Sequence, residues 1–176
     1  MLALPLLAVL VQALGGAPVD ALKAPAGTKA IVFLFTSTDC PISNRYAPEV
    51  RRLAEEFAPK GVVFRLIYPN PADEQPMIRE HMTAFSYAGA WEPLRDPRHV
   101  LVKYAGATIT PEVAVYAGGR IVYRGRIDDR DVDLGRERPS PTQRDLFDAL
   151  TAIVAGKPVP HATTQAVGCF ISDFVR

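Results

Sequence analysis

The chain contains two cysteines, and the first stands where its chemistry would be enhanced. Cys40 directly precedes Pro41, at the change from an apolar run to an amphipathic stretch. The backbone N–H groups and the dipole at a helix start favour negative charge, so this position should lower the pKa of Cys40 and supply a thiolate nucleophile. Ser43 lies three residues later, where its hydroxyl could donate a hydrogen bond to the thiolate but could not form a disulfide.

The second cysteine, Cys169, lies 129 positions later, in a tail that contains several glycines and prolines. The tail could fold back so that Cys169 resolves an oxidised Cys40 by forming a disulfide. Alternatively, Cys169 is a distant free thiol or an intermolecular partner. The apolar stretch AVGCFI around it is typical of a segment that packs on the protein, so we favour the intramolecular pair.

The elements that must position these cysteines follow from periodicity and from turn residues. The sequence predicts a buried strand, a helix, a second strand, a second helix, a very short strand, a third helix, a β-hairpin around Gly118-Gly119 and a last helix. Their approximate ranges are 31–35, 41–58, 62–67, a helix ending near 87, 94–97, 96–105, 112–127 and 140–154. This order predicts an α/β fold in which helices cover both faces of one mixed central sheet.

Two expected caps would mark helix starts. Asp96 followed by Pro97 is typical of an N-cap, and Ser140 with Gln143 predicts a capping box at the last helix.

Two stretches resemble the thioredoxin fold. CPIS, from Cys40 to Ser43, looks like the thioredoxin CxxC motif with its second cysteine replaced. TITPEVAVY matches the stretch that carries a cis-proline facing the active cysteine, here Thr110-Pro111. The resemblance covers residues 24–156 and implies a thioredoxin-like three-layer sandwich. Within this superfamily, DCPISN, VYRGRIDDR and VGCFI are similar to exported redoxin-domain (AhpC/TSA-like) proteins, which implies redox chemistry.

The resemblance implies a thiol–disulfide oxidoreductase without a cofactor. Cys40 would attack a protein disulfide or a small oxidant, Pro41 would help lower its pKa, and Cys169 would resolve the product. Ser43 and the backbone at Thr110-Pro111 would position the sulfur and the substrate, with Asn44 as a further substrate contact.

Two alternatives remain open. The first is a peroxiredoxin-like peroxide reductase, with Arg124 or Arg126 on the substrate side. Phe33 stands where the peroxidase motif has proline, which weighs against it. The second is a non-catalytic module that binds a partner, or that binds copper through Cys40, Cys169 and His161.

The N-terminus is apolar from Leu2 to about Leu14, too short for the roughly 20 residues that span a bilayer. With the small residues 15–17 behind it, it predicts a secretory signal within residues 1–20; an uncleaved anchor or a buried segment is the alternative. We therefore expect a domain at 24–156, a tail at 157–176, and a periplasmic or otherwise exported protein, in which cysteines can pair. The net charge of +1 indicates neither nucleic acid nor an anionic membrane as partner.

An acidic run, two histidines and three aromatic residues are expected to have structural rather than functional roles. The acidic run DDRDVD at 128–133 lacks the calcium-loop pattern and predicts a solvated loop. His81 and His99 fall within predicted helices and should be at the surface or partly packed. The aromatic residues Phe85, Tyr87 and Trp91 should pack under a loop rather than line a groove.

Overall fold

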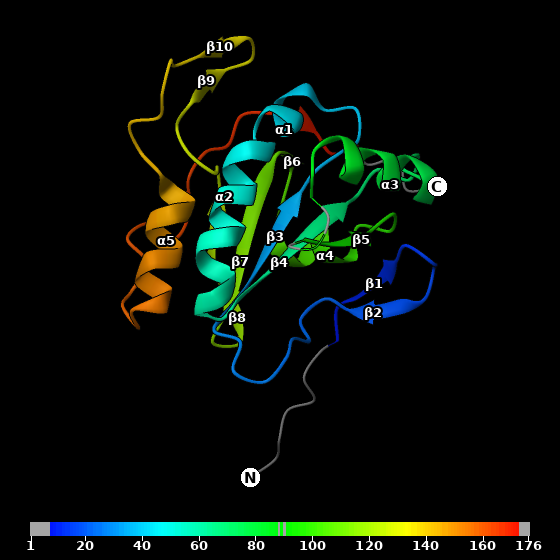
Figure 1. The fold of residues 1–176 in the computed structure, drawn as a ribbon, viewed down its shortest axis with the longest axis horizontal. Helices are drawn as coiled ribbons and strands as arrows, with labels where there is room; N and C mark the ends of the chain where they lie inside the picture. Colours follow the sequence, from blue (N-terminus) through cyan, green and yellow to red (C-terminus); the bar gives the residue numbers. More distant parts are fainter. Residues whose placement is uncertain (1–7, 88, 90, 173–176) are drawn as a thin grey trace.

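The computed structural model describes residues 8–87, 89 and 91–172, and a mixed seven-stranded sheet forms its centre (Figure 1). Strand order across this sheet is β2-β1-β5-β4-β3-β7-β8, with β3 parallel to β4 and antiparallel to β7. The strand bounds are β1 Leu10–Ala13, β2 Pro18–Asp20, β3 Ala30–Phe35, β4 Val62–Tyr68, β5 Glu92–Arg95, β7 Glu112–Ala117 and β8 Arg120–Gly125. The predicted order of elements and the β-hairpin are both confirmed.

Helices cover both faces of the sheet, and every residue of β3 is therefore buried. Val32 and Leu34 pack into a core with α2 (Ala47–Phe57), α3 (Gln75–Ala84) and α5 (Asp145–Val154). The other residues of β3, Ile31, Phe33 and Phe35, pack on the opposite face, in a second core under α4 (Val100–Ala105). This is the period-two pattern of a strand between two layers, and it confirms the predicted α/β sandwich.

The helix after Cys40 is divided in two, where the sequence predicted one helix over 41–58. Helix α1 spans Pro41–Arg45, Tyr46 separates it from α2, and the 3₁₀ turn η1 (Ala58–Lys60) follows. Pro48 has no N–H with which to bond the carbonyl of Asn44, as a continuous helix would require. The Tyr46 N–H instead bonds the Ser43 carbonyl at 3.1 Å, which closes a tighter turn.

The predicted N-cap at Asp96 is wrong in position. Helix α4 begins at Val100 with His99 at its N-cap. The Asp96 carboxylate still satisfies the helix start from outside, because it accepts hydrogen bonds from the N–H groups of Val100 (2.8 Å) and Val102 (2.9 Å). The Asp96 side chain therefore bonds the first turn of α4, but at residues further along the chain than an N-cap at Asp96 would reach, because the intervening residues form a turn.

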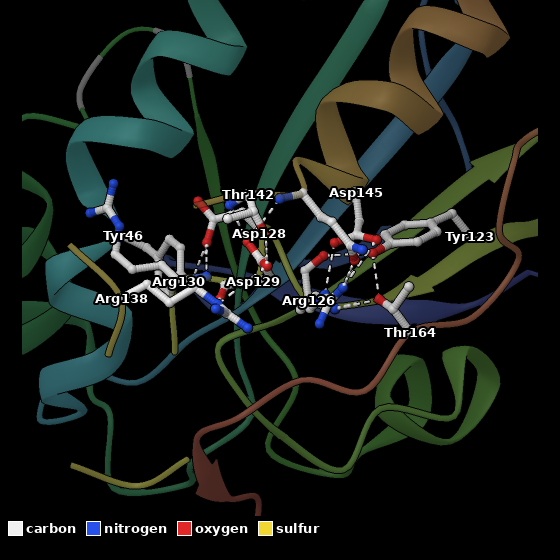
Figure 2. A network of polar contacts seen from close by, with 11 residues as sticks. Tyr46, Tyr123, Arg126, Asp128, Asp129, Arg130, Arg138, Thr142, Asp145 and Thr164 are labelled. Carbon is white, nitrogen blue, oxygen red and sulfur yellow. Dashed lines mark hydrogen bonds and ion pairs between the residues drawn. The ribbon is translucent and has the colours of Figure 1, made fainter. Parts of the chain in front are cut away.

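The predicted capping box of Ser140 and Gln143 is also wrong, because α5 begins at Asp145. The Asp129 carboxylate accepts hydrogen bonds from the N–H groups of Thr142 (2.6 Å) and Gln143 (2.9 Å). These bonds hold the segment before α5 as a loop against residues 126–131 (Figure 2). Two short strands, β9 (Asp131–Asp133) and β10 (Arg136–Glu137), pair within this excursion.

The acidic run DDRDVD is not the solvated loop that the sequence predicted. Asp128, Asp129 and Asp131 are buried, with exposed fractions of 2%, 6% and 7%. The Tyr46 hydroxyl donates to Asp128 at 2.7 Å, and Arg45 pairs with Asp131 at 2.9 Å. The carboxylates therefore hold this connection against α1 and the start of α2. Among the described residues, no group of three His, Cys, Asp or Glu side chains could hold a metal ion.

The folded domain begins earlier than the expected boundary at residue 24. Strands β1 and β2 form an antiparallel pair at the edge of the sheet, and β1 also pairs with β5. Val9 and Val11 are buried in the second core, with 2% and 3% of their surface exposed. The second half of the apolar N-terminal segment is therefore part of the sheet; residues 1–7 of the predicted signal lie outside the described residues. No helix in the described part of the chain is long and apolar enough to cross a membrane.

Candidate functional site

Cys40 occupies the N-cap of α1, as the sequence predicted, with Pro41 at the first helical position. Strand β3 ends at Phe35, and a short polar connection brings the chain to Cys40 above the end of the sheet. The residues directly before Cys40, such as Thr38 and Asp39, are polar, yet Cys40 is only 2% exposed. The tail covers it, and this long-range contact has no signature in the residues around position 40.

The backbone at Thr110-Pro111 faces this thiol. The peptide bond between these two residues is cis, as the resemblance implied. The Thr110 carbonyl oxygen lies 3.2 Å from the Cys40 Sγ and accepts a hydrogen bond from it. The sheet thus presents a backbone edge directly beside the candidate nucleophile.

The tail brings Cys169 to the same place. Strand β11 (Cys169–Phe170) pairs antiparallel with β6 (Ile109–Thr110), so that Cys169 lies opposite Thr110. The sulfur atoms of Cys40 and Cys169 are 3.3 Å apart and are not bonded to each other. The two cysteines are thus within direct reach of each other, and formation of the disulfide itself stays a prediction.

The environment of Cys40 favours its thiolate. Burial raises the pKa of the thiol, but hydrogen bonds outweigh this effect and leave the pKa below its ordinary value. The largest of these contributions come from the hydroxyl and the backbone N–H of Ser43, followed by Thr110 and Cys169. Ser43 is buried, and its hydroxyl lies near the Cys40 sulfur without a conventional hydrogen bond to it or to any other described residue. This donor is therefore available to a charged sulfur.

Cys169 differs from Cys40 in both exposure and acidity. Burial of its sulfur, the hydrogen bond that its thiol donates to the Cys40 sulfur, and the charges of Cys40 and Asp39 raise the pKa of Cys169 to about 11. Cys169 as a residue is nevertheless exposed, whereas Cys40 is buried. The pair therefore combines one acidic thiol with one that stays protonated at neutral pH, and the acidic thiol is Cys40, as the sequence predicted.

Asn44 does not line the cavity beside Cys40. Its side-chain amide donates to the Thr38 carbonyl at 3.4 Å, and its oxygen contacts the Nε2 of His81 at 2.8 Å. The Nδ1 of His81 in turn lies 2.9 Å from the Tyr68 hydroxyl. These hydrogen bonds tie the loop before Cys40 to α3 and β4. The side chain of Asn44 therefore stabilises the fold and does not face the cavity.

Both histidines are buried more deeply than the sequence predicted, and His99 precedes its helix as the N-cap. His81 and His99 are buried, with exposed fractions of 5% and 2%, and each has a polar partner. Their partners lie 13 to 37 positions away in the chain, and no local pattern signals such contacts. Tyr87 and Trp91 pack in the first core as predicted.

A cavity of about 220 Å³ opens beside the two sulfurs. Its lining combines the cysteines with polar groups from the loop before Cys40 and apolar groups from the tail: Ser37, Asp39, Cys40, Pro69, Asn70, Thr110, Cys169, Phe170, Ile171 and Ser172. Sequence reasoning missed Ser37, Asp39 and Asn70 as lining residues. The Ser37 hydroxyl donates to Asp39 at 2.6 Å, while Thr38 donates to the buried Asp73 at 2.5 Å. These bonds fix the rim of the cavity.

The side chains expected for a peroxidase, Arg124 and Arg126, and for a copper site, His161, do not lie at the Cys40 sulfur. Arg126 pairs with Asp145 at 2.7 Å, and Arg124 lies 3.6 Å from Glu112 (Figure 2 shows the first pair). His161 is exposed on the tail and forms no metal-binding group with the cysteines in the described part of the chain. Neither arginine contacts the Cys40 sulfur.

No family model and no curated protein matches this sequence. Solved structures do match. An uncharacterized conserved protein from Geobacillus kaustophilus has a TM-score of 0.78 at 25% identity, covering 96% of this chain and 90% of its own. A hypothetical protein from Sinorhizobium meliloti 1021 has a TM-score of 0.74 at 24% identity, covering 94% and 90%.

A secreted Mycobacterium tuberculosis disulfide oxidoreductase homologous to E. coli DsbE is also similar, with a TM-score of 0.53 at 19% identity, covering 84% of this chain and 94% of its own. These structural matches show the fold of the chain: it is a thioredoxin-like α/β fold, of the kind found in thiol–disulfide oxidoreductases. Its two cysteines lie in contact at the place where that fold presents a backbone edge to the start of a helix.

Proposed function

We propose that this protein is a thiol–disulfide oxidoreductase in which Cys40 is the nucleophile and Cys169 the resolving cysteine. The observation that carries the proposal is the 3.3 Å contact between the two sulfurs, one with a lowered pKa and the other with a pKa raised to about 11. An acidic thiol reacts first, because only the thiolate attacks. The less acidic thiol stays protonated until the mixed disulfide has formed.

The proposed reaction has two exchanges. The Cys40 thiolate attacks one sulfur of a substrate disulfide, forms a mixed disulfide and releases the first substrate thiol. The Cys169 thiol then loses its proton and attacks the Cys40 sulfur, forming the Cys40–Cys169 disulfide and releasing the second thiol. The protein loses two electrons and two protons, and the substrate disulfide gains them; the reverse sequence oxidises a dithiol.

Pro41, Ser43, Thr110 and Pro111 have supporting roles in this proposal. Pro41 starts α1 so that its first turn points at the sulfur. Ser43 stabilises the thiolate, and the Thr110 carbonyl orients the thiol. Cys169 supplies the second sulfur that a CxxC motif would have placed at position 43. A distant cysteine can take that role because β11 brings it back to the site.

We further propose that the protein works outside the cytoplasm, with protein thiols or a small oxidant as partner. The relative from M. tuberculosis is described as secreted, and a resolving disulfide fits an oxidising compartment.

The test is oxidation of the fully reduced protein by bis(2-hydroxyethyl) disulfide, followed by mass spectrometry after digestion without reductant. We expect one cross-linked peptide pair that joins Cys40 to Cys169. In Cys169→Ser, the mixed disulfide at Cys40 should accumulate and multiple turnover should be lost. Cys40→Ser should give neither product at a comparable rate.

Three outcomes would contradict the proposal. Free thiols after oxidation would exclude exchange at Cys40, and a disulfide only between chains would exclude the resolving role. Unchanged turnover in Cys169→Ser would reduce Cys169 to an incidental thiol. A parallel reaction with hydrogen peroxide that is much faster than the disulfide reaction would favour a peroxidase instead.

A further inference from the structure

The tail is bound along its length rather than hanging from α5. Figure 1 shows it, in orange to red, passing from α5 to the end of the sheet near α1. The tail pairs with β8, where Arg124 exchanges backbone hydrogen bonds with Ala162 and Thr164, each 3.0 Å long. The Tyr123 hydroxyl and the Arg126 N–H also bond the Thr164 hydroxyl, at 2.7 Å and 3.1 Å (Figure 2).

Two glycines permit a close approach of the tail to the domain. A Cβ at Gly125 would overlap Thr164, and a Cβ at Gly168 would overlap the carbonyl of Thr110. Gly168 does not have a left-handed backbone, so the need for glycine there is one of space rather than of conformation. The domain and the tail thus fit each other at both ends of the segment.

The last part of the tail lies on the backbone edge beside Cys40. Strand β11 pairs with β6, and the Ile171 N–H extends the pairing with a 3.0 Å bond to the Thr108 carbonyl. An extended polypeptide that binds by adding a strand needs the same backbone groups of β6. The chain's own tail and such a substrate cannot occupy this edge together.

Coverage by the tail also limits the space at the nucleophile. Cys40 is 2% exposed, and what remains open beside the sulfurs is the cavity of about 220 Å³. Phe170 and Ile171, both from the tail, form part of its wall. A small molecule can enter such a cavity, whereas a disulfide embedded in a polypeptide brings flanking residues that would collide with the tail.

Resting on the proposed function, we propose that the docked tail acts as an internal substrate strand that excludes polypeptide disulfides from Cys40 and admits small-molecule disulfides. A small disulfide RSSR loses its S–S bond as the Cys40 thiolate attacks, which releases one RS⁻ that takes up a proton. Attack by the Cys169 sulfur then breaks the mixed disulfide and releases the second RSH. A polypeptide disulfide reacts by the same chemistry only after β11 has left β6.

The test compares two probes, bis(2-hydroxyethyl) disulfide and insulin, in a Cys169→Ser background, where β11 keeps its backbone pairing and the mixed disulfide at Cys40 accumulates. The rate of mixed-disulfide formation is measured by mass spectrometry under single-turnover conditions. Two full-length variants loosen the tail. Gly168→Ala forces a Cβ against Thr110, and Ile171→Pro removes the N–H that bonds the Thr108 carbonyl.

We expect each variant to raise the insulin rate, relative to the small-disulfide rate, by about tenfold or more. Tenfold corresponds to about 1.4 kcal/mol of strand pairing that no longer has to be broken before the substrate binds. Gly15→Ala is the matched control, because a Cβ at that glycine meets nothing within 4 Å. Its ratio of rates should equal that of the parent.

The possible failures are distinguishable. No reaction of Cys40 with the small disulfide in any variant would mean that the proposed function has failed. A parent that reacts with insulin as fast as with the small disulfide would overturn the exclusion by the tail, and so would an unchanged ratio in both loosened variants. Thermal unfolding of each variant verifies that the domain is intact. If both variants are intact, a raised ratio in either one supports the exclusion by the tail, and if only one is intact, its ratio alone decides the question.

Discussion

Removing one hydroxyl should measurably raise the pKa of Cys40. In Ser43→Ala, the thiolate loses the strongest side-chain donor that opposes its burial. A hydrogen bond to a charged group contributes roughly 1.5–3 kcal/mol, and about 1.4 kcal/mol corresponds to one pH unit. The pKa of Cys40 should therefore rise by about one to two. The backbone N–H of Ser43 remains, so part of the stabilisation should persist.

The assay is alkylation by iodoacetamide as a function of pH, in a Cys169→Ser background so that Cys40 is the only thiol. Loss of the Ser43 hydroxyl raises the pKa of Cys40, so the fraction of thiolate falls most at pH values between the parent pKa and the variant pKa. Alkylation of Ser43→Ala should be slower than that of the parent at neutral pH. The two rates should converge at high pH, where both thiols are fully ionised.

A matched control separates this effect from general damage. Ser140→Ala removes the same hydroxyl from an exposed loop and should leave the titration of Cys40 unchanged. If the titration curve of Ser43→Ala coincides with that of the parent, the Ser43 hydroxyl does not stabilise the thiolate. The lowered pKa would then have to come from the backbone alone.

Two further predictions concern stability. Deletion of residues 1–17 removes β1 and two buried valines, Val9 before the strand and Val11 within it, each contributing roughly 1.5–3 kcal/mol. Denaturant unfolding should therefore show a loss of about 3–6 kcal/mol, and an unchanged midpoint would mean that β1 is dispensable. Hydrogen bonds lower the pKa of Asp129 to about 2 against its burial, so its contribution is present above pH 4 and is lost as the pH falls towards 2. Asp129→Asn should therefore destabilise the protein at neutral pH and progressively less below pH 4, and a constant difference across that range would refute the linkage.

The order of elements and the position of Cys40 could be predicted from the sequence, because both depend on local patterns. The all-apolar run at 31–35 is a strand covered on both faces, and Pro41 is suited to the first position of a helix. The preference of Cys40 for its thiolate could be predicted from the helix start, whereas the pKa of Cys169 is raised by burial and by contacts with Cys40 and Asp39 that only the fold creates.

The local patterns failed where a partner distant in the sequence competes with them. The capping box at Ser140 is unused because the carboxylate of Asp129 takes the N–H groups of Thr142 and Gln143. The acidic run at 128–133 is buried because Tyr46 and arginines from other elements satisfy it. A run of acidic residues predicts a solvent-exposed loop, because the sequence does not show the distant partners that would allow its burial.

The site itself was decided by the tertiary structure. The amino-acid sequence determined that a nucleophilic thiol stands at a helix start, that a proline-containing strand start follows, and that a second thiol lies in an apolar tail. Only the fold determined that β11 pairs with β6, that glycine at position 168 lets the tail approach Thr110, and that the two sulfurs meet at 3.3 Å. The physical reason is that strand pairing between segments far apart in the chain depends on backbone groups that every residue carries, so the side-chain sequence does not specify which edge the tail will occupy.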